Sequence, residues 1–408
     1  MQVFRFLTLD ALAPLARSWD RLARGVPFRS WAWLSAWWRH YGEGMPGATS
    51  SLYVLGLVDR AGQLAGVAPW YLRRCPARGR VLRWLGSGEV CSEYLSVLCQ
   101  PEQEEEVAES LADWLTSAKA DAADGPSIAD RWDLLELSDV QAQDSAVGRL
   151  ADALEARGCS VHRRPGPPCW RIELPATWQH YLAMLAKDHR KQVRRIEQRL
   201  FSTGRAVMRS VCDEAELPHG QSVLVTLHQR RRGRLGQPGC FASSRFAAFH
   251  GEVMRELLRS GHLGLHWIEL DGTPIAAEYH LLGFEAVYAY QSGMDPDASG
   301  IGPGNVAHVA TIRHAIERGY RVFDFLRGDE PYKAHWRARP HAILEIDVVS
   351  PRITARLRHR IWRAGREARR WLRGRMRCGV GRLLAASRRA APAASSPVPL
   401  PEQADPKP

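Results

Sequence analysis

Residues 264–333 contain the most constraining pattern in this chain: three predicted strands, a glycine-rich turn, a helix and a final strand, in that order. The first strand alternates apolar and polar residues, and Asp271-Gly272 after it is a tight-hairpin signal. Two apolar and aromatic strands follow, and then the loop sequence GMDPDASGIGPGN. From Asn305 the apolar residues recur at helical spacing, and Gly319 is placed to end that helix. This order of elements predicts an α/β unit.

An earlier segment, residues 52–140, repeats the order of strand, turn, strands, helix and strand. The stretch VDRAGQLAGVAPWYL echoes ELDGTPIAAEYHLL, and RWDLLELSD echoes YRVFDFLRGD. The sequence therefore predicts two tandem copies of one unit, with chance agreement of common elements as the alternative. In the first copy, Pro101-Glu102 and the carboxylates that follow would repel a phosphate, so the second copy is the expected cofactor binder.

A chain of 408 residues allows two packed domains. We predict an N-terminal domain over 1–162 and a C-terminal domain over 163–350, because a proline-broken linker (RRPGPPC) begins at residue 163. A basic amphipathic helix is predicted over 351–389 and a disordered, low-complexity tail over 390–408. The predicted fold class is α/β (α+β), with mixed sheets flanked by helices and duplicated in tandem.

The basic charge of the chain is confined to its end. Residues 351–390 hold fourteen arginines and one acid, whereas residues 1–350 carry 41 basic and 41 acidic side chains. A basic amphipathic helix could rest on anionic lipid, dock its apolar stripe on the second domain or contact RNA. Lipid contact is the preferred interpretation, and nucleic acid is not expected as a partner.

Other features favour a cytoplasmic protein. No apolar run reaches the roughly 18 residues of a membrane span. The first twenty residues contain Arg5, Asp10 and Arg17 in place of a secretory apolar segment. The eight cysteines form no C-x-x-C pair, which suits a reducing compartment. The histidines complete no metal-ligand pattern, so no metal site is expected. Peripheral contact with the inner face of the membrane through 351–389 extends this hypothesis.

Two predicted helices have more than one interpretation. The aromatic segment 27–44, with Ser30 as its cap candidate, is typical of a core helix filled with indoles, and lining of a cleft is the alternative. The second half of helix 178–204 carries a run of basic side chains. A solvated face is the usual explanation for such a run, and contact with phosphates beside an active cleft is the alternative.

The loop GIGPGN (300–305) ahead of a helix offers backbone N–H groups to phosphates. An ordinary turn is the alternative, but the position after a three-strand meander favours phosphate binding. The cofactor-binding candidates are Gly300, Gly302, Gly304 and Asn305.

The densest polar cluster follows the last strand of the second copy. Asp324 is a base candidate there, or the ion-pair partner of Arg327 or Lys333. Glu278 lies in an apolar strand where a purely structural segment would rarely place a carboxylate, so it is a second base candidate. Its pKa would be raised if it faced a cleft.

Three segments resemble a known family. They are FRSWAWLSAWWRHYG (28–42), KDHRKQVRRIEQRL (187–200) and, most specific, YAYQSGMDP…GPGNV…AIERGYRVFDFLRGDEPYKAHW (288–336). Together they span about residues 25–345 and resemble the bacterial GNAT-like proteins of the CelD type. That family is named for cellulose and exopolysaccharide gene clusters and is related to the Fem-type peptidoglycan transferases.

The resemblance implies a double-GNAT acyltransferase with acetyl-CoA, or another acyl-CoA, as co-substrate and no permanently bound cofactor. A splay between two parallel strands would admit the pantetheine, and a helix start would take the pyrophosphate. The implied acceptor is an amine or hydroxyl of a saccharide, lipid-linked or free, in polysaccharide or cell-envelope biosynthesis. The alternatives are Fem-type transfer from aminoacyl-tRNA and a non-catalytic GNAT-derived binding module.

The family pattern D-F-x-x-G-x-x-x-Y-K falls on 324–333 of this chain. Fem-type relatives place a lysine at the position of Lys333, which suits an anionic substrate or a carbonyl oxygen. Tyr288 and Tyr290 are predicted on one strand face that Ser292 continues, and Tyr290 could protonate the leaving thiolate, although core packing explains it equally well. The catalytic candidates are Asp324, Glu278, Tyr290 and Lys333.

The first domain contributes one further implied contact. The family often has Asp-Tyr where this chain has Glu93-Tyr94, so the acid is kept but lengthened by one methylene. The substrate-binding candidates are Arg327, Tyr332, Glu93 and Tyr94.

Overall fold

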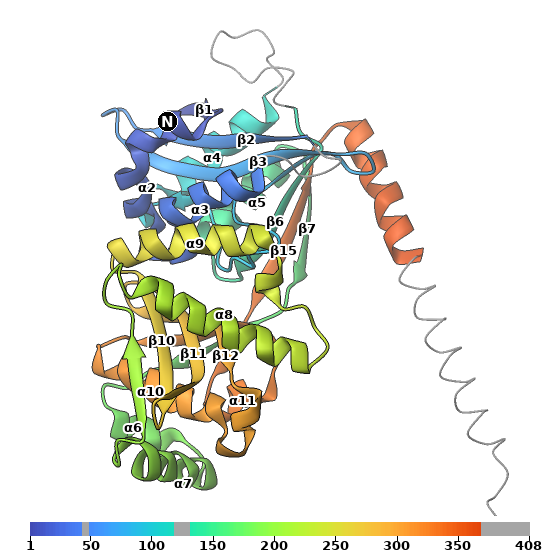
Figure 1. The fold of residues 1–408 in the computed structure, drawn as a ribbon. Coiled ribbons are helices and arrows are strands. Elements are labelled where there is room, and N and C mark those ends of the chain that lie inside the picture. Colours follow the sequence, from blue (N-terminus) through green and yellow to red (C-terminus); the bar gives the residue numbers. More distant parts are fainter. Residues whose placement is uncertain (43–48, 118–130, 369–408) are drawn as a thin grey trace, which may run out of the picture. The chain divides into compact units, whose positions relative to one another are not determined.

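The structure, a computed structural model, describes residues 1–42, 49–117 and 131–368. It is a mixed α/β fold in which two mixed sheets are flanked by helices (Figure 1). This confirms the predicted fold class.

The first sheet has the strand order β1-β2-β3-β4-β6-β15-β7, and the short β5 pairs with β3. Among its described strands, only β4 and β6 are parallel neighbours. The strands are β1 (Gln2–Phe6), β2 (Ser50–Val58), β3 (Leu64–Cys75), β4 (Gly79–Trp84), β5 (Leu98–Cys99), β6 (Leu134–Gln141), β7 (Ser160–Pro165) and β15 (Ile343–Val349).

The second sheet has the order β14-β8-β13-β12-β11-β10-β9. Here β12 and β13 are the one parallel pair among the described strands. The strands are β8 (Cys169–Glu173), β9 (Ala206–Ser210), β10 (Leu263–Leu270), β11 (Thr273–Leu282), β12 (Ala286–Met294), β13 (Val322–Arg327) and β14 (Arg339–His341).

The two sheets repeat one unit. The meander β2-β3-β4 continues through helix α4 (Glu104–Thr116) into parallel β6, and the meander β10-β11-β12 continues through α10 (Pro303–Glu317) into parallel β13. A helix is needed at this point because parallel neighbours cannot be joined by a hairpin. The predicted tandem duplication is therefore present.

The sheets do not divide the chain at the predicted domain boundaries. β7 extends past residue 162 and belongs to the first sheet. β15, which the prediction places in the second domain, pairs between β6 and β7 in the first sheet. We call residues 1–165 with 343–356 the first lobe, and residues 169–341 the second lobe. Alternation along a strand identifies its buried face, not the sheet that it joins, so the sequence does not reveal this return.

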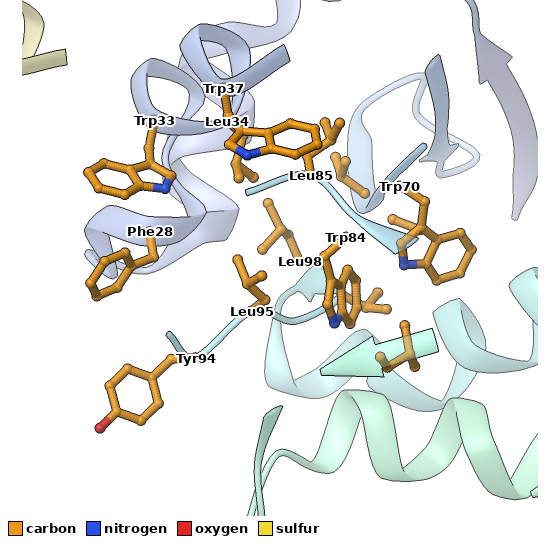
Figure 2. Packing of buried hydrophobic residues seen from close by; sticks show 14 of the residues in the cluster. Phe28, Trp33, Leu34, Trp37, Trp70, Trp84, Leu85, Tyr94, Leu95 and Leu98 are labelled. Atoms are coloured by element: carbon orange, nitrogen blue, oxygen red, sulfur yellow. The ribbon is translucent and has the colours of Figure 1, made fainter. Parts of the chain in front are cut away.

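A tryptophan-rich core fills the first lobe (Figure 2). Helix α3 (Trp31–Trp37) begins at Ser30, whose Oγ accepts a hydrogen bond from the Trp33 N–H at 3.2 Å. Trp33 and Trp37 are fully buried, as are Trp70 and Trp84 on β3 and β4. This confirms the interpretation of segment 27–44 as a core helix. The other α-helices of this lobe are α1 (Leu9–Leu12), α2 (Ala16–Ala23) and α5 (Ser145–Ala156).

In the second lobe, α8 (Leu217–Arg234) and α10 lie on opposite faces of the sheet. A Cβ on Gly293 of β12 would lie 2.6 Å from the backbone nitrogen of His228 in α8. The next residue, Met294, faces α10, because a Cβ on Gly304 would lie 2.9 Å from its methyl carbon. The other helices are α6 (Trp178–Met184), α7 (Lys187–Ile196), α9 (Ser244–Arg259) and α11 (Pro331–His335).

The end of the described chain is helical over residues 353–368. Residues 369–389 of the predicted basic helix and the predicted tail 390–408 lie outside the described residues. The described residues 357–368 belong to a unit separate from residues 1–356. In the part of the chain that the structure describes, no helix is both long and apolar enough to cross a membrane. The predicted lipid contact of this segment stays a prediction.

Candidate active site

A cavity of about 410 Å³ opens at the first turn of α10. The end of β12, the 3₁₀ helix η8 (Pro296–Ile301) and part of α8 complete its wall. Three of the four predicted cofactor residues line it: Gly302, Gly304 and Asn305. Gly300 is not among the lining residues, and a side chain there would point into open space.

The start of α10 is set by its sequence. Gly302 takes a left-handed conformation (φ 69°), which glycine adopts at little cost, and Pro303 occupies the first helical position, where the missing N–H is not needed. No side chain caps this end. The Asn305 and Val306 N–H groups donate to the Gly302 carbonyl at 2.9 and 3.2 Å, which leaves the Gly304 N–H, at the positive end of the helix dipole, for a ligand. The cavity therefore has an anion-binding wall.

The two parallel strands beside this helix separate. β12 and β13 pair over three residue positions, and the pairing ends at Tyr288 and Asp324. β12 continues to Met294 and β13 to Arg327 with no further pairing between these described segments. This is the splay that the family resemblance implies, and it leaves one edge of β12 without a strand partner.

A β-bulge in β12 changes which side chains share a face. The register between β11 and β12 shifts at Tyr290, which has no opposite residue. Beyond the bulge Ser292 lies opposite Glu278, whereas Tyr290 packs on the other face against Tyr279. The prediction that Ser292 continues the face of Tyr288 and Tyr290 is wrong, because the extra residue moves the alternation by one.

Glu278 lies behind the cavity wall. It is on β11, is 4% exposed, and is the strand neighbour of Ser292, which lines the cavity. Its Oε2 lies 3.6 Å from Nε2 of His280, and its Oε1 has no hydrogen-bond partner among the described residues. Burial raises the pKa of Glu278 to about 7, and the charges of His308 and Arg231 offset part of that rise.

His308, Tyr332 and Arg231 line the cavity in front of Glu278. The rings of His308 and Tyr332 are stacked, with centroids 5.5 Å apart. Arg231 donates to the Met294 thioether, a weak acceptor that leaves its positive charge for an anion. Burial raises the pKa of the Tyr332 hydroxyl, and the charge of Glu278 adds to that rise.

Asp324 is fully buried and fully hydrogen-bonded. Its carboxylate accepts from the Tyr94 hydroxyl at 2.6 Å, from Arg171 Nε at 2.8 Å and from the Leu326 N–H at 2.7 Å. Burial raises its pKa, and these three donors oppose the rise. Because Tyr94 belongs to the first lobe and Arg171 to the second, Asp324 joins the two lobes.

An ion pair crosses the lobes beside this network. Glu93 is buried and accepts from Arg327, which also contacts Asp139 at 3.3 Å. The Cys169 thiol lies 3.6 Å from the other Glu93 oxygen. Burial raises the pKa of Glu93 to about 8, with Arg327 as the main opposing charge. The predicted substrate contacts Glu93, Tyr94 and Arg327 thus lie together, and each has a protein partner.

Tyr290 is half-buried on the face away from the cavity. Its hydroxyl donates to the Val90 carbonyl at 2.7 Å and lies 3.1 Å from Nε2 of His250. Burial raises the pKa of Tyr290 well above its ordinary value. The hydroxyl that was predicted as an acid therefore has its proton in a hydrogen bond to the first lobe.

Lys333 closes the turn after β13. Its buried ammonium donates to the backbone carbonyls of Leu326, Arg327 and Gly328 at 3.2, 2.7 and 3.2 Å, and pairs with Glu330 at 2.9 Å. Lysine suits this position because its three N–H donors match three converging carbonyls. The ammonium holds the end of the strand that borders the splay.

The structure thus divides the predicted site residues into two groups. Tyr332 and the loop residues 302–305 line the cavity with Glu278 behind its wall, whereas Asp324, Lys333, Glu93, Tyr94 and Arg327 form the network at the end of β13. Gly300 and Tyr290 belong to neither group. Sequence reasoning missed His308, which lies one helical turn after Gly304 and could have been found from that spacing. Among the described residues, no cluster of three or more candidate ligands could hold a metal ion.

The duplicated α/β unit, the splayed parallel strands and the helix start at the cavity are features of a GNAT-like fold. Residues 187–334 match the family described as "Acetyltransferase (GNAT) domain". This match lies within the second lobe.

Solved structures extend the likeness over both lobes. The crystal structure of FemX has a TM-score of 0.57 at 12% identity, covering 88% of this chain and 99% of that one. A conserved protein of unknown function from Bacteroides thetaiotaomicron has a TM-score of 0.50 at 11% identity, covering 86% of this chain and 100% of that one. At these identities the likeness is one of fold. No curated protein sequence matches the chain, and the narrower resemblance to the CelD type stays a prediction.

Proposed function

We propose that the protein transfers an acyl group, acetyl in the first instance, from acyl-CoA to an amine or hydroxyl of a saccharide or cell-envelope precursor. The observation that carries this proposal is the uncapped start of α10, which opens on a cavity beside the splay of β12 and β13. The acceptor class comes from the family resemblance alone.

The cavity suits the phosphate-rich part of CoA. The Gly304 N–H would donate to the diphosphate, as helix starts do in other phosphate sites, whereas the Asn305 N–H already donates to the Gly302 carbonyl at 2.9 Å. Arg231, from α8, would supply a full positive charge on the same wall. The amides of the pantetheine arm would pair with the free edge of β12, which the splay leaves without a strand.

Glu278 is the base in this proposal, because its carboxylate has an unpartnered oxygen and a pKa near the working pH. Asp324, the other base candidate, has every oxygen in a hydrogen bond and would act by fixing the end of β13. Lys333 would act by holding the end of β13 that borders the splay. Tyr290, the predicted acid, faces away from the cavity and has no part in this proposal.

The rate of acyl transfer is expected to rise with pH through about 7 and then level off. Glu278 must be ionised to accept a proton, and its pKa is raised to about 7, so the active form is lost as the pH falls below that value. Initial rates of thiol release from acetyl-CoA with an amino-sugar acceptor would measure the profile. Glu278→Gln should remove this rise in rate with pH and lower kcat by about 10²–10⁴-fold. An unchanged profile in this variant would exclude Glu278 as the base.

Acetyl-CoA is expected to stabilise the folded protein. A ligand at about 100 times its Kd that binds only the folded state adds roughly 2.7 kcal/mol to the free energy of unfolding. Thermal unfolding with and without acetyl-CoA would measure this gain. Gly304→Glu should abolish the gain, because it places a carboxylate on the anion-binding wall.

The matched control for that experiment is Gly300→Glu. It adds the same charge to the same loop, but Gly300 does not line the cavity and has open space around it. The gain should survive in this control. If the wild type shows no gain with acetyl-CoA, charged tRNA is the donor to test next, and after it the non-catalytic binding module.

One observation supports the aminoacyl-tRNA alternative. Lys187, Lys191 and Arg194 on α7 are exposed, and within the described residues no ion pair engages them. The helix also packs against α10, the helix that starts at the cavity. The positive charges of such a face would bind the backbone phosphates of a nucleic acid.

A further inference from the structure

Beneath α10, a row of ionisable side chains begins at the cavity and runs away from it. From the cavity inward the row is His308, Glu278, His280, His266 and His314. Glu278 Oε2 lies 3.6 Å from His280 Nε2, and the ring centroids are 5.6 Å apart for His280 and His266 and 5.4 Å apart for His266 and His314. The role given to Glu278 above uses only the first part of this row.

The two ends of the row differ from its middle in exposure. His308 lines the cavity, and His314, in the last turns of α10, is half-buried and reaches solvent. Between them His280 is 2% exposed and His266 is 7% exposed. The row therefore connects the cavity to the surface through the core of the second lobe.

A structural role does not account for these residues well. Among the described residues, Glu278 Oε1, His280 Nε2 and His308 Nδ1 are buried without a hydrogen-bond partner. Each such atom costs free energy that an apolar side chain in the same place would not cost. Several unsatisfied groups in contiguous positions point to a use that needs titratable atoms.

His266 is placed to pass a proton on. Its Nδ1 lies 2.7 Å from the Ser210 hydroxyl, which can either donate or accept by rotating. Burial lowers the pKa of His280 to about 3 and that of His266 well below its ordinary value. Both rings are therefore neutral at rest, and one proton must leave each ring as another arrives.

We propose that this row is a proton exit, in which Glu278 takes the proton of the acceptor and His280 and His266 pass it to His314 and the solvent. The inference rests on the proposed acyl transfer and adds His280 and His266 to it as positioning residues. With donor and acceptor filling the cavity, the front of Glu278 is closed to water, and the row is its outlet.

The proton balance identifies the acceptor class. An ammonium acceptor reacts with a thioester to give an amide, a thiol and one free proton, because nitrogen loses two protons and the thiolate takes only one. A hydroxyl acceptor loses one proton and the thiolate takes it, so none is released. An exit path is needed only in the first case, and the structure thus assigns an amine acceptor.

The charges around the row favour outward movement. Glu278 and His280 are faced by His308 and His314 on α10, by His266 on β10, by Arg231 on α8 and by Tyr332 on α11. Arg231 lies at the cavity end, where its positive charge opposes return of the proton. At the other end, burial lowers the pKa of His314, Arg318 lowers it further, and Glu317 opposes this fall, so His314 gives its proton up to solvent readily.

The test follows the proton on Glu278 and needs no acceptor. Infrared difference spectra of the full-length protein, at a pH below that at which Glu278 ionises, contain the C=O band of its protonated carboxyl, which Glu278→Gln identifies by its loss. Rapid mixing into D₂O then gives the rate at which deuterium enters that carboxyl, with and without CoA in the cavity. His280→Phe should slow the exchange about 10²-fold or more, since a positioned proton-transfer group typically contributes about 10²–10⁴-fold.

His280→Asn is the second variant, in case phenylalanine prevents folding. His250→Asn is the matched control, because His250 is equally buried but lies on α9, against the opposite face of the sheet. Equal exchange rates in wild type and both His280 variants would overturn the proposal, as would discovery that the natural acceptor is a hydroxyl. If CoA gives no thermal shift, the proposed function fails on that measurement alone. The exchange rates measured without CoA still show whether the proton of Glu278 leaves through His280, because Glu278 does not line the cavity.

Discussion

Replacing Asp324 with alanine is expected to lower the free energy of unfolding by about 3–5 kcal/mol, the usual cost of removing one partner of a buried ion pair. The change leaves the Arg171 guanidinium without its anion, and the Tyr94 hydroxyl and Leu326 N–H without their acceptor. Because these groups join the two lobes, the midpoint of urea unfolding should fall for both lobes together. Circular dichroism and tryptophan fluorescence would follow the transition, since buried indoles lie in both lobes, Trp33 in the first and Trp336 in the second.

Asp329→Ala is the control for this measurement. Asp329 is an exposed acid after the same strand, and its loss should change stability by no more than about 0.5 kcal/mol. A stable Asp324→Ala protein that has lost acyl transfer would show that Asp324 is the base and that its network is dispensable.

Replacing Lys333 with methionine is the second change with a large expected effect. Methionine fills a similar volume but has no donor, so three carbonyls at the end of β13 lose their partner. At about 1–3 kcal/mol for each unsatisfied buried group, we expect a loss of roughly 3 kcal/mol or more in the free energy of unfolding. Urea denaturation would measure it.

Lys333→Arg separates a structural role from a catalytic one. Arginine keeps the charge, but its planar group cannot direct donors at three carbonyls around one point, so stability should fall here as well. Wild-type stability with lost activity in the methionine variant would instead place the ammonium of Lys333 on the substrate.

Much of the fold could be predicted because its signals are local. The hairpin at Asp271-Gly272, the cap at Ser30 and the helix after the glycine-rich loop are each decided by a few residues, and the structure has all of them, although this helix begins at Pro303 and not at the predicted Asn305. The return of β15 to the first sheet could not be predicted. It depends on pairing with strands some two hundred residues earlier, and the residues of 343–349 do not indicate which strands they pair with.

The candidate site was predictable to the same extent. A glycine-rich loop before a helix and a carboxylate in an apolar strand are visible in sequence, and both lie at the cavity. The direction of a side chain after a bulge is not visible, which is why Ser292 was placed on the wrong face. The partners of Asp324 were also hidden, because Tyr94 and Arg171 are far from it in the chain.

The position of β15 has a consequence for the way this protein can be shortened or recombined. A gene fragment that stops before residue 343 removes the strand between β6 and β7 and leaves both with bare hydrogen-bonding edges, which pair with other chains. Excising the second half of the gene therefore damages the half that remains. The two duplicated units therefore cannot be expressed separately by cutting the gene between them, because the first sheet needs a strand that follows the second unit in the chain.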